Sequence, residues 1–142
     1  MSLLTIRPNA RGASNQHADG GLSNWNRCDE VISDGDATFC YNLTVGDGLA
    51  QFKTDMYALD NSGGEAGAIT LVKIYVVARY AIVDAGGYAK VSVAIRVGSS
   101  NYYGSLIDLT GVYTAYSAQW PTNPAGGNWT WAAINALQAG YY

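Results

Sequence analysis

Charge, histidine and cysteine are all scarce in this chain of 142 residues. Only 13% of its residues are charged, the net charge is −3, and there are one histidine and two cysteines. The eight Lys and Arg residues are scattered singly, so we expect no binding of nucleic acid or of an anionic membrane. The single histidine, His17, lies in a polar, glycine-containing loop with no apolar support to lower its solvation, so a solvated loop histidine is the favoured interpretation. The sequence therefore predicts no catalytic site and no cofactor.

Secretion and membrane signals are also missing. Only a short apolar stretch precedes Arg7 and Pro8, and it lacks the charged and apolar regions of a signal peptide. No apolar run approaches the roughly 20 residues that a membrane-spanning helix needs. We therefore expect the protein to be made in a cytoplasm and to have no membrane partner.

Glycine and tyrosine are abundant, with 17 and 11 residues, and apolar residues recur with a period of two. In the segment "ITLVKIYVVARYAI" (69–82), one face of the expected strand holds Val72, Ile74 and Val76. The other face holds Leu71, Lys73, Tyr75, Val77 and Arg79. The segment "YAKVSVAIRVG" (88–98) alternates in the same way. Such alternation is typical of strands with one buried face. Both segments are predicted strands.

These two strands are predicted to form a hairpin closed by the glycines of "DAGG" (84–87). The register that makes the two apolar faces coincide pairs Val76 with Ile95. It also places Tyr75 opposite Arg96 on the outer face, where a ring–guanidinium contact is expected.

Further short strands and glycine-rich turns predict one all-β domain spanning residues 1–142. The fold class is an antiparallel, jelly-roll-like β-sandwich of about eight strands with one short C-terminal helix. An N-terminal strand followed by a polar loop is expected within 1–23. The remaining predicted strands are 37–45, 55–59, 101–107 and 112–120.

The chain ends with "WPTNPAGGNWTWAAINALQAGYY" (120–142), which holds three of the four tryptophans. A short helix within 128–140 is predicted, with Asn128 or Thr130 as its cap and Gly140 as its stop. A helix of this length needs an apolar side that docks on other elements. We expect that side to close one end of the sandwich through three residues: Trp131, Ile134 and Leu137.

An acidic segment near the N-terminus, "CDEVISDGDATFC" (28–40), allows two interpretations. Asp34 and Asp36 are weak calcium candidates, because hard cations use Asp-rich loops, but the spacing is not that of an EF-hand. A solvated acidic turn is the favoured interpretation, so no metal is predicted. Cys28 and Cys40 flank the segment and are a candidate disulfide, worth about 3 kcal/mol in the chain-entropy model.

Aromatic residues gather in the last third of the chain. They fit core packing, a protein interface, or stacking on a sugar. The residues that we take as interface or ligand candidates are Tyr75, Arg96, Tyr102, Tyr103 and Trp120.

Four stretches occur in an order that resembles a family of small jelly-roll proteins of tailed phages and prophages. They are "NWNRCDEVISDGDATFCYN", "AITLVKIYVVARY", "VAIRVGSSNYYGS" and the C-terminal stretch, whose "WTWAAINALQAG" is the most specific part. The likeness runs from about Asn24 to Tyr142. The chain departs from the family pattern at Cys28 and Cys40, where aliphatic residues are expected.

This resemblance implies a non-enzymatic structural protein of the virion, either a capsid decoration protein or an appendage subunit. It implies a homo-oligomer, with a trimer as one option, that binds viral capsid or tail proteins. Two alternatives stay open. One is a carbohydrate-binding sandwich that stacks a glycan on its C-terminal aromatics, and the other is a subunit of an extracellular filament.

Overall fold

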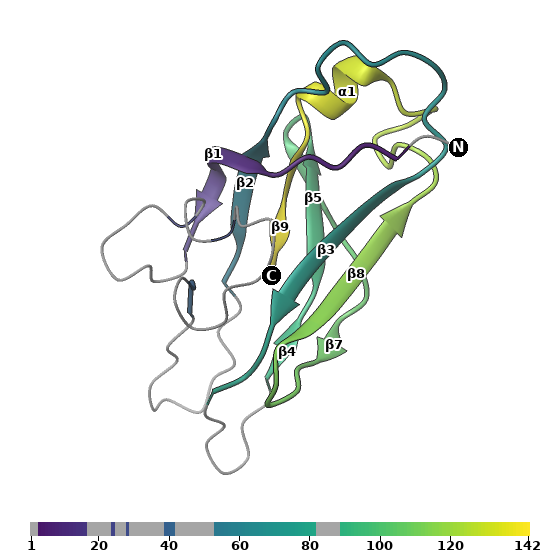
Figure 1. Cartoon of the computed structure of the whole chain (residues 1–142). Coiled ribbons are helices and arrows are strands. Elements are labelled where there is room, and N and C mark those ends of the chain that lie inside the picture. The colour runs from purple at the N-terminus through teal and green to yellow at the C-terminus, as the bar shows by residue number, and fades with distance from the viewer. Residues whose placement is uncertain (1–2, 17–23, 25–27, 29–38, 42–52, 82–88) are drawn as a thin grey trace.

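The computed structural model describes residues 3–16, 24, 28, 39–41, 53–81 and 89–142, and they form an antiparallel β-sandwich (Figure 1). The all-β fold class is therefore confirmed. Nine strands and one short helix are seen in this part of the chain. Their bounds are β1 Pro8–Asn15, β2 Asp55–Leu59, β3 Val72–Ala78, β4 Lys90–Val91, β5 Val93–Val97, β6 Ser100–Tyr103, β7 Ile107–Asp108, β8 Thr114–Trp120, α1 Trp131–Asn135 and β9 Gln138–Tyr141.

The main layer is a five-stranded sheet in the order β1-β2-β9-β5-β6. In the second layer β3 pairs with β8, and a short β4–β7 pair lies beyond it. Figure 1 shows β3 and β8 crossing in front of β5 and β9, with α1 at one end of the two layers. The pairs β2–β9 and β3–β8 are nested, because each joins an early strand to a late one. Nested long-range pairing is the arrangement of a jelly roll.

The predicted hairpin between 69–82 and 88–98 is wrong. Val76 lies opposite Tyr116 of β8, whereas Ile95 lies opposite Ala139 of β9 and Tyr102 of β6. The predicted turn, 84–87, lies outside the described residues. The two apolar faces nevertheless meet, because Val76 packs against the buried cluster that contains Val93. Alternation identified the buried face of each strand but not its hydrogen-bonded partner.

The interior consists of two clusters of buried side chains. The smaller one lies between β3, β8 and the start of β5 and contains Val91, Val93 and Tyr116. The larger one lies nearer to α1 and contains Leu59, Val72, Ile95, Trp129, Ile134, Leu137 and Ala139. Each aliphatic side chain removed from water in this way stabilises the fold by roughly 1.5–3 kcal/mol.

The strand at the N-terminus of the described residues lies within 1–23. Residues 3–7 have no regular secondary structure, and the strand begins at Pro8. β1 is the edge strand of the five-stranded sheet and pairs with β2. Proline is tolerated as the first residue of an edge strand. A Cβ on Gly12 would lie 2.3 Å from the Met56 carbonyl oxygen, so glycine lets the two backbones approach. Backbone pairing, not an apolar pattern, makes this segment a strand.

The predicted C-terminal helix is present, but it is shorter than the predicted range 128–140. Thr130 is its cap, because the Thr130 hydroxyl accepts a hydrogen bond from the Ala133 N–H at 3.1 Å. The helix ends at Asn135, and β9 follows in the centre of the main sheet. Gly140 is therefore a strand residue and not a helix stop. A Cβ there would lie 1.8 Å from the Asp55 carbonyl oxygen, so no other residue fits without moving β2.

The predicted strand 101–107 is two strands, β6 and β7, separated at Gly104. A Cβ on Gly104 would lie 2.6 Å from the Cβ of Ala118 in β8, so the chain passes close to the second layer here. The predicted strands 55–59 and 112–120 are confirmed, the second beginning at Thr114. Of the predicted strand 37–45, only residues 39–41 are described, and they contain no extended strand.

Candidate functional site

The side chains on the outer face of the five-stranded sheet form the most distinctive polar and aromatic surface. Opposed residues of an antiparallel pair point to the same face. Val93 and Ile95 of β5 are buried in the interior, so Ala94 and Arg96 point to the opposite face, where Ala94 is fully buried and Arg96 is half-buried. The register places Tyr103 opposite Ala94 and Asn101 opposite Arg96. We call the residues Arg96, Asn101, Tyr103 and Tyr142 the outer patch.

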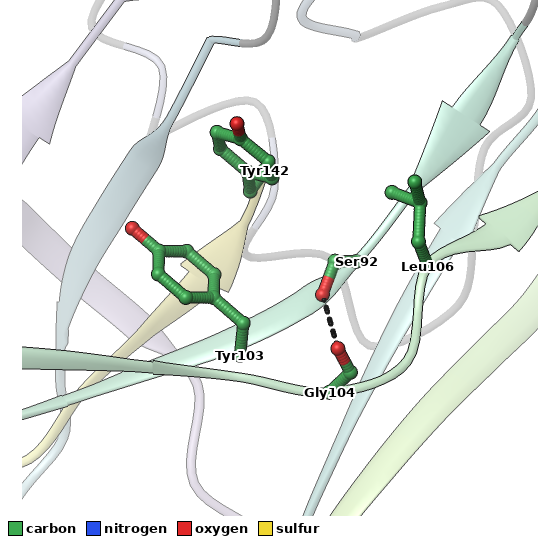
Figure 2. Close-up of a pocket in the computed structure, with 5 residues that line it drawn as sticks. All are labelled: Ser92, Tyr103, Gly104, Leu106 and Tyr142. Atoms are coloured by element: carbon green, nitrogen blue, oxygen red, sulfur yellow. Dashed lines mark hydrogen bonds between the residues drawn. The ribbon is translucent and has the colours of Figure 1, made fainter.

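The rings of Tyr103 and Tyr142 lie side by side in the outer patch, as Figure 2 shows. Their centroids are 5.1 Å apart and their planes are inclined by 54°. The position of Tyr142 is set by Ser92, since each backbone N–H donates to the other's carbonyl oxygen at 2.9 Å. Tyr103 is 48% exposed, so its ring is available to a ligand.

An open depression of about 310 Å³ lies beside these rings. Its lining consists of Ser92, Tyr103, Gly104, Leu106 and Tyr142 (Figure 2). The Ser92 hydroxyl donates to the Gly104 carbonyl oxygen at 2.9 Å, which holds the chain as it leaves β6. The surface is therefore mostly apolar, with polar atoms that are engaged in holding the backbone.

Arg96 supplies the charge of the outer patch. Its Nη1 donates to Asn101 Oδ1 at 2.9 Å, and Asn101 Nδ2 donates to the Tyr103 hydroxyl oxygen at 3.3 Å. Within the described part of the chain, no carboxylate forms an ion pair with Arg96. The guanidinium is thus hydrogen-bonded to a neutral amide. The outer patch combines this cation with an exposed aromatic ring.

Tyr75 does not lie opposite Arg96, so that prediction is wrong. Tyr75 is on β3 in the other layer, opposite Ser117. The ammonium nitrogen of its own neighbour Lys73 lies 4.7 Å from the centre of its ring. The cation–ring contact therefore forms within one strand, because residues two apart on a strand share a face.

The other two aromatic candidates face the interior. Tyr102 packs against the larger cluster, and Trp120 packs against both clusters. The indole N–H of Trp129 donates to the Trp120 carbonyl oxygen at 2.9 Å, which binds the end of β8 to the segment before α1. Both candidates act in packing. Of the five predicted interface or ligand residues, only Arg96 and Tyr103 come together.

The three residues predicted to close the sandwich lie where expected. Ile134 and Leu137 are buried in the larger cluster beneath α1. Trp131 is half-buried against the same cluster, and its indole N–H donates to the Gly67 carbonyl oxygen at 2.9 Å. This hydrogen bond to Gly67 anchors α1 over the end of the sandwich.

A second chemical constellation lies on the inner face of the main sheet, around Asp55. The Asp55 side chain is fully buried and accepts hydrogen bonds from the Gln16 N–H, from the Asn24 amide and, at 3.1 Å, from the Tyr57 hydroxyl. The hydroxyl oxygens of Tyr57 and Tyr141 are 3.1 Å apart. Burial is the main cause that raises the pKa of both tyrosines well above the ordinary value.

The two cysteines border this buried constellation. Cys28 Sγ and Cys40 Sγ are 3.7 Å apart, in hydrogen-bond contact and not joined by a disulfide. The hydrogen bond with Cys28 lowers the pKa of the Cys40 thiol, against the effect of burial. The predicted disulfide stays a prediction, although the sulfurs are adjacent. His17, Asp34 and Asp36 lie outside the described residues, and no group of three metal-ligating side chains occurs in the rest.

Sequence reasoning missed Asn101 and the pairing of Tyr103 with Tyr142. One signal was available: Gly98 and Ser99 form a two-residue turn, with Gly98 at φ 60°, between β5 and β6. Glycine at the first position of such a turn is typical of a tight hairpin. That turn would have paired Arg96 with Asn101. No comparable signal indicated that Tyr142 lies beside Tyr103.

Comparisons with known proteins give no relatives: no family model, no curated protein and no solved structure matches the chain. Membership of a phage structural family therefore stays a prediction. The described residues contain no helix with the length and apolar character needed to cross a bilayer. The function has to be argued from the chain's own surfaces.

Proposed function

We propose that the chain is a non-enzymatic structural subunit of a virion, a capsid decoration or appendage protein that self-associates and binds a protein lattice. The observation that supports this most is an exposed apolar stripe on the outer face of the β3 layer. Leu71, Tyr75 and Val77 are 46%, 62% and 46% exposed and lie on that face, with the charged Lys73 between Leu71 and Tyr75. We call these three residues the β3 stripe. Exposed apolar side chains grouped on one face mark surfaces that another protein covers.

Unpaired strand edges support the same proposal. Among the described residues, β3 pairs only with β8, so each of these strands has one edge without a strand partner. Such edges present backbone N–H and C=O groups to a strand of another subunit. A low charge density also favours a packed assembly, since 13% charged residues leave few repulsive groups between copies.

The test is the size of the particle in solution, measured by sedimentation velocity over a range of concentrations. We expect a closed oligomer in the parent protein and a shift toward the monomer in Tyr75→Ser/Val77→Ser. Val112→Ser is the matched control, because Val112 is 69% exposed and lies outside the β3 stripe. A chain that is monomeric at every concentration would contradict self-association. Open-ended growth into fibres would favour the filament alternative.

Attachment to a lattice is tested by co-sedimentation of the pure protein with emptied tailed-phage capsids. We expect saturable binding that the stripe variant weakens and Val112→Ser does not. Absence of saturable binding to any capsid or tail preparation would contradict the virion assignment while leaving self-association standing.

A carbohydrate-binding role is the second candidate, and the outer patch favours it. The exposed ring of Tyr103 gives a flat apolar surface on which the C–H face of a sugar stacks, and the inclined ring of Tyr142 and an open depression lie beside it. This role is compatible with the first, because the outer patch and the β3 stripe lie on different sheets. It is tested by binding of neutral and charged oligosaccharides to the parent protein and to Tyr103→Ala.

A further inference from the structure

The outer patch joins an uncompensated cation to the paired tyrosine rings. We propose that it binds an acidic saccharide, whose carboxylate pairs with Arg96 while the apolar face of its ring stacks on Tyr103 and Tyr142. This inference rests on the carbohydrate-binding role proposed above and adds the charge class of the ligand.

The hydrogen bonding of Arg96 is the reason for proposing an acidic ligand. The side chain is half-buried, yet its one hydrogen-bond partner in the described residues is the neutral Asn101. A guanidinium has five N–H donors in a planar fork, so several donors are left. A carboxylate takes two of them in parallel, and a fixed guanidinium loses little conformational freedom when it does so. A neutral sugar would leave this charge unpaired.

The spacing of the outer patch suits a sugar unit. Tyr103 opposes Ala94, and Asn101 opposes Arg96, two residues further along β5. Same-face neighbours on a strand are about 7 Å apart, which is the scale of one pyranose unit with its carboxylate. Ala94 lies between the charge and the rings and is fully buried, so a ligand would contact Arg96 and Tyr103 across the atoms that cover Ala94.

Amide groups beside Arg96 provide contacts for hydroxyls. Gln138 lies opposite Arg96 on β9, and its Oε1 accepts a hydrogen bond from the Ala13 N–H at 2.7 Å. That bond orients the Gln138 side chain and leaves its NH₂ group as a donor. Asn101 is oriented likewise between Arg96 and Tyr103. Oriented amides, a guanidinium and stacked rings are the chemistry that recognises a uronic or sialic acid.

One charge on a shallow aromatic surface is poorly suited to nucleic acid, which is bound by several phosphate contacts. It also lacks the several apolar pockets of a peptide groove. A single carboxylate beside a ring face is matched by one acidic sugar within an oligosaccharide.

The experiment is a panel of acidic oligosaccharides titrated against the full chain and followed by heteronuclear NMR. The panel consists of oligogalacturonate, oligomannuronate, hyaluronan fragments and oligosialic acid, each with its carboxyl-reduced counterpart. We expect at least one acidic member to bind saturably and to shift the Arg96, Asn101 and Tyr103 signals. Its reduced counterpart should bind at least tenfold more weakly.

Four variants locate the site. Arg96→Gln should lower the affinity for the acidic member about tenfold and leave the affinity for its reduced counterpart unchanged. Tyr103→Ala should lower both. Lys73→Gln is the charge control and Tyr80→Ala the aromatic control, because both residues are exposed and lie away from the outer patch. The spectrum of each variant reports whether its fold is intact.

The outcomes distinguish carbohydrate binding in general from the specificity for an acidic saccharide. Equal binding of acidic and reduced forms would overturn the acidic-saccharide inference and leave carbohydrate binding standing. No binding by any member, acidic or reduced, would overturn both. Binding that moves signals elsewhere and survives Arg96→Gln and Tyr103→Ala would overturn the assignment to the outer patch.

Discussion

The two layers of the sandwich present an arginine or lysine and a tyrosine on their outer faces, but they use them in opposite ways. On β3 the ammonium of Lys73 lies over the ring of Tyr75, 4.7 Å from its centre. On β5 the guanidinium of Arg96 is bonded to Asn101, and the nearby rings of Tyr103 and Tyr142 contact each other. The first face places its cation against its own ring. On the second face the cation and the rings make separate contacts.

The inner faces of the two layers also differ in the side chains that they bury. The β3–β8 layer contributes aliphatic side chains and Tyr116 to the interior. The five-stranded sheet contributes a buried carboxylate, Asp55, together with Tyr57 and Tyr141. Buried polar networks stabilise only while every member is bonded. The main sheet therefore depends on buried hydrogen bonds, whereas the β3–β8 layer depends on apolar packing. Variants of each layer test this difference.

The largest effect is expected from Gly140→Ala. The new Cβ would collide with the Asp55 carbonyl oxygen, so β9 and β2 must separate. We expect a loss of at least about 3 kcal/mol in the free energy of unfolding, measured by urea denaturation. Gly111→Ala is the matched control, because its Cβ meets only the Tyr80 ring at 3.5 Å, an ordinary contact. Equal stability of the two variants would contradict the central position of β9.

Joining Cys28 to Cys40 should have the next largest effect. Exchange with oxidised glutathione forms the bond and releases two molecules of reduced glutathione. We expect the oxidised chain to gain about 3 kcal/mol, because the bond restricts a short loop in the unfolded state. Thermal unfolding of the oxidised and reduced protein measures the gain, with Cys28→Ser as the control that cannot respond. An unchanged unfolding temperature in the oxidised protein would show that the thiols have no structural role.

A smaller effect, about 1 kcal/mol at neutral pH, is expected from Tyr57→Phe, which removes one buried hydrogen-bonding hydroxyl. Its sharper signature is the pH dependence of stability. The folded-state pKa of Tyr57 is raised, so its stabilisation is complete below about pH 10, the unfolded pKa, and falls as the pH rises beyond it. Each such tyrosine adds up to about 1.4 kcal/mol of loss per pH unit. Tyr57→Phe should therefore flatten the alkaline loss.

Tyr116→Phe in the β3–β8 layer should do the opposite. The hydrogen bond with Thr110 lowers the pKa of Tyr116, so the folded state ionises first and Tyr116 adds stability as the pH approaches 10. Its removal should steepen the alkaline loss. Unfolding titrations from pH 8 to 11 compare the three proteins. If both variants flatten the curve equally, the assigned difference between the two layers is incorrect.

Particular residues show how far sequence reasoning reaches. The alternation around Val76 and Ile95 correctly identified buried faces, and Ile134 and Leu137 were correctly placed beneath the short helix. Arg96 and Tyr103, two of the predicted interface or ligand candidates, lie together, but their neighbours Asn101 and Tyr142 were not predicted. Gly140 followed a helical pattern and is nevertheless a strand residue. Local patterns report burial and propensity, whereas pairing joins segments that are far apart in the chain.

The sequence by itself determined that this chain is an antiparallel β protein of low charge, because period-two alternation and glycine-rich turns allow few other folds. Only the tertiary structure decided which strands pair, because backbone hydrogen bonds are alike in every strand and do not encode a partner. It also made a strand of the polar segment Pro8–Asn15 and brought Tyr142 next to Tyr103. The candidate site exists only through those pairings. Its charge comes from Arg96, and its shape comes from the arrangement of β5, β6 and β9.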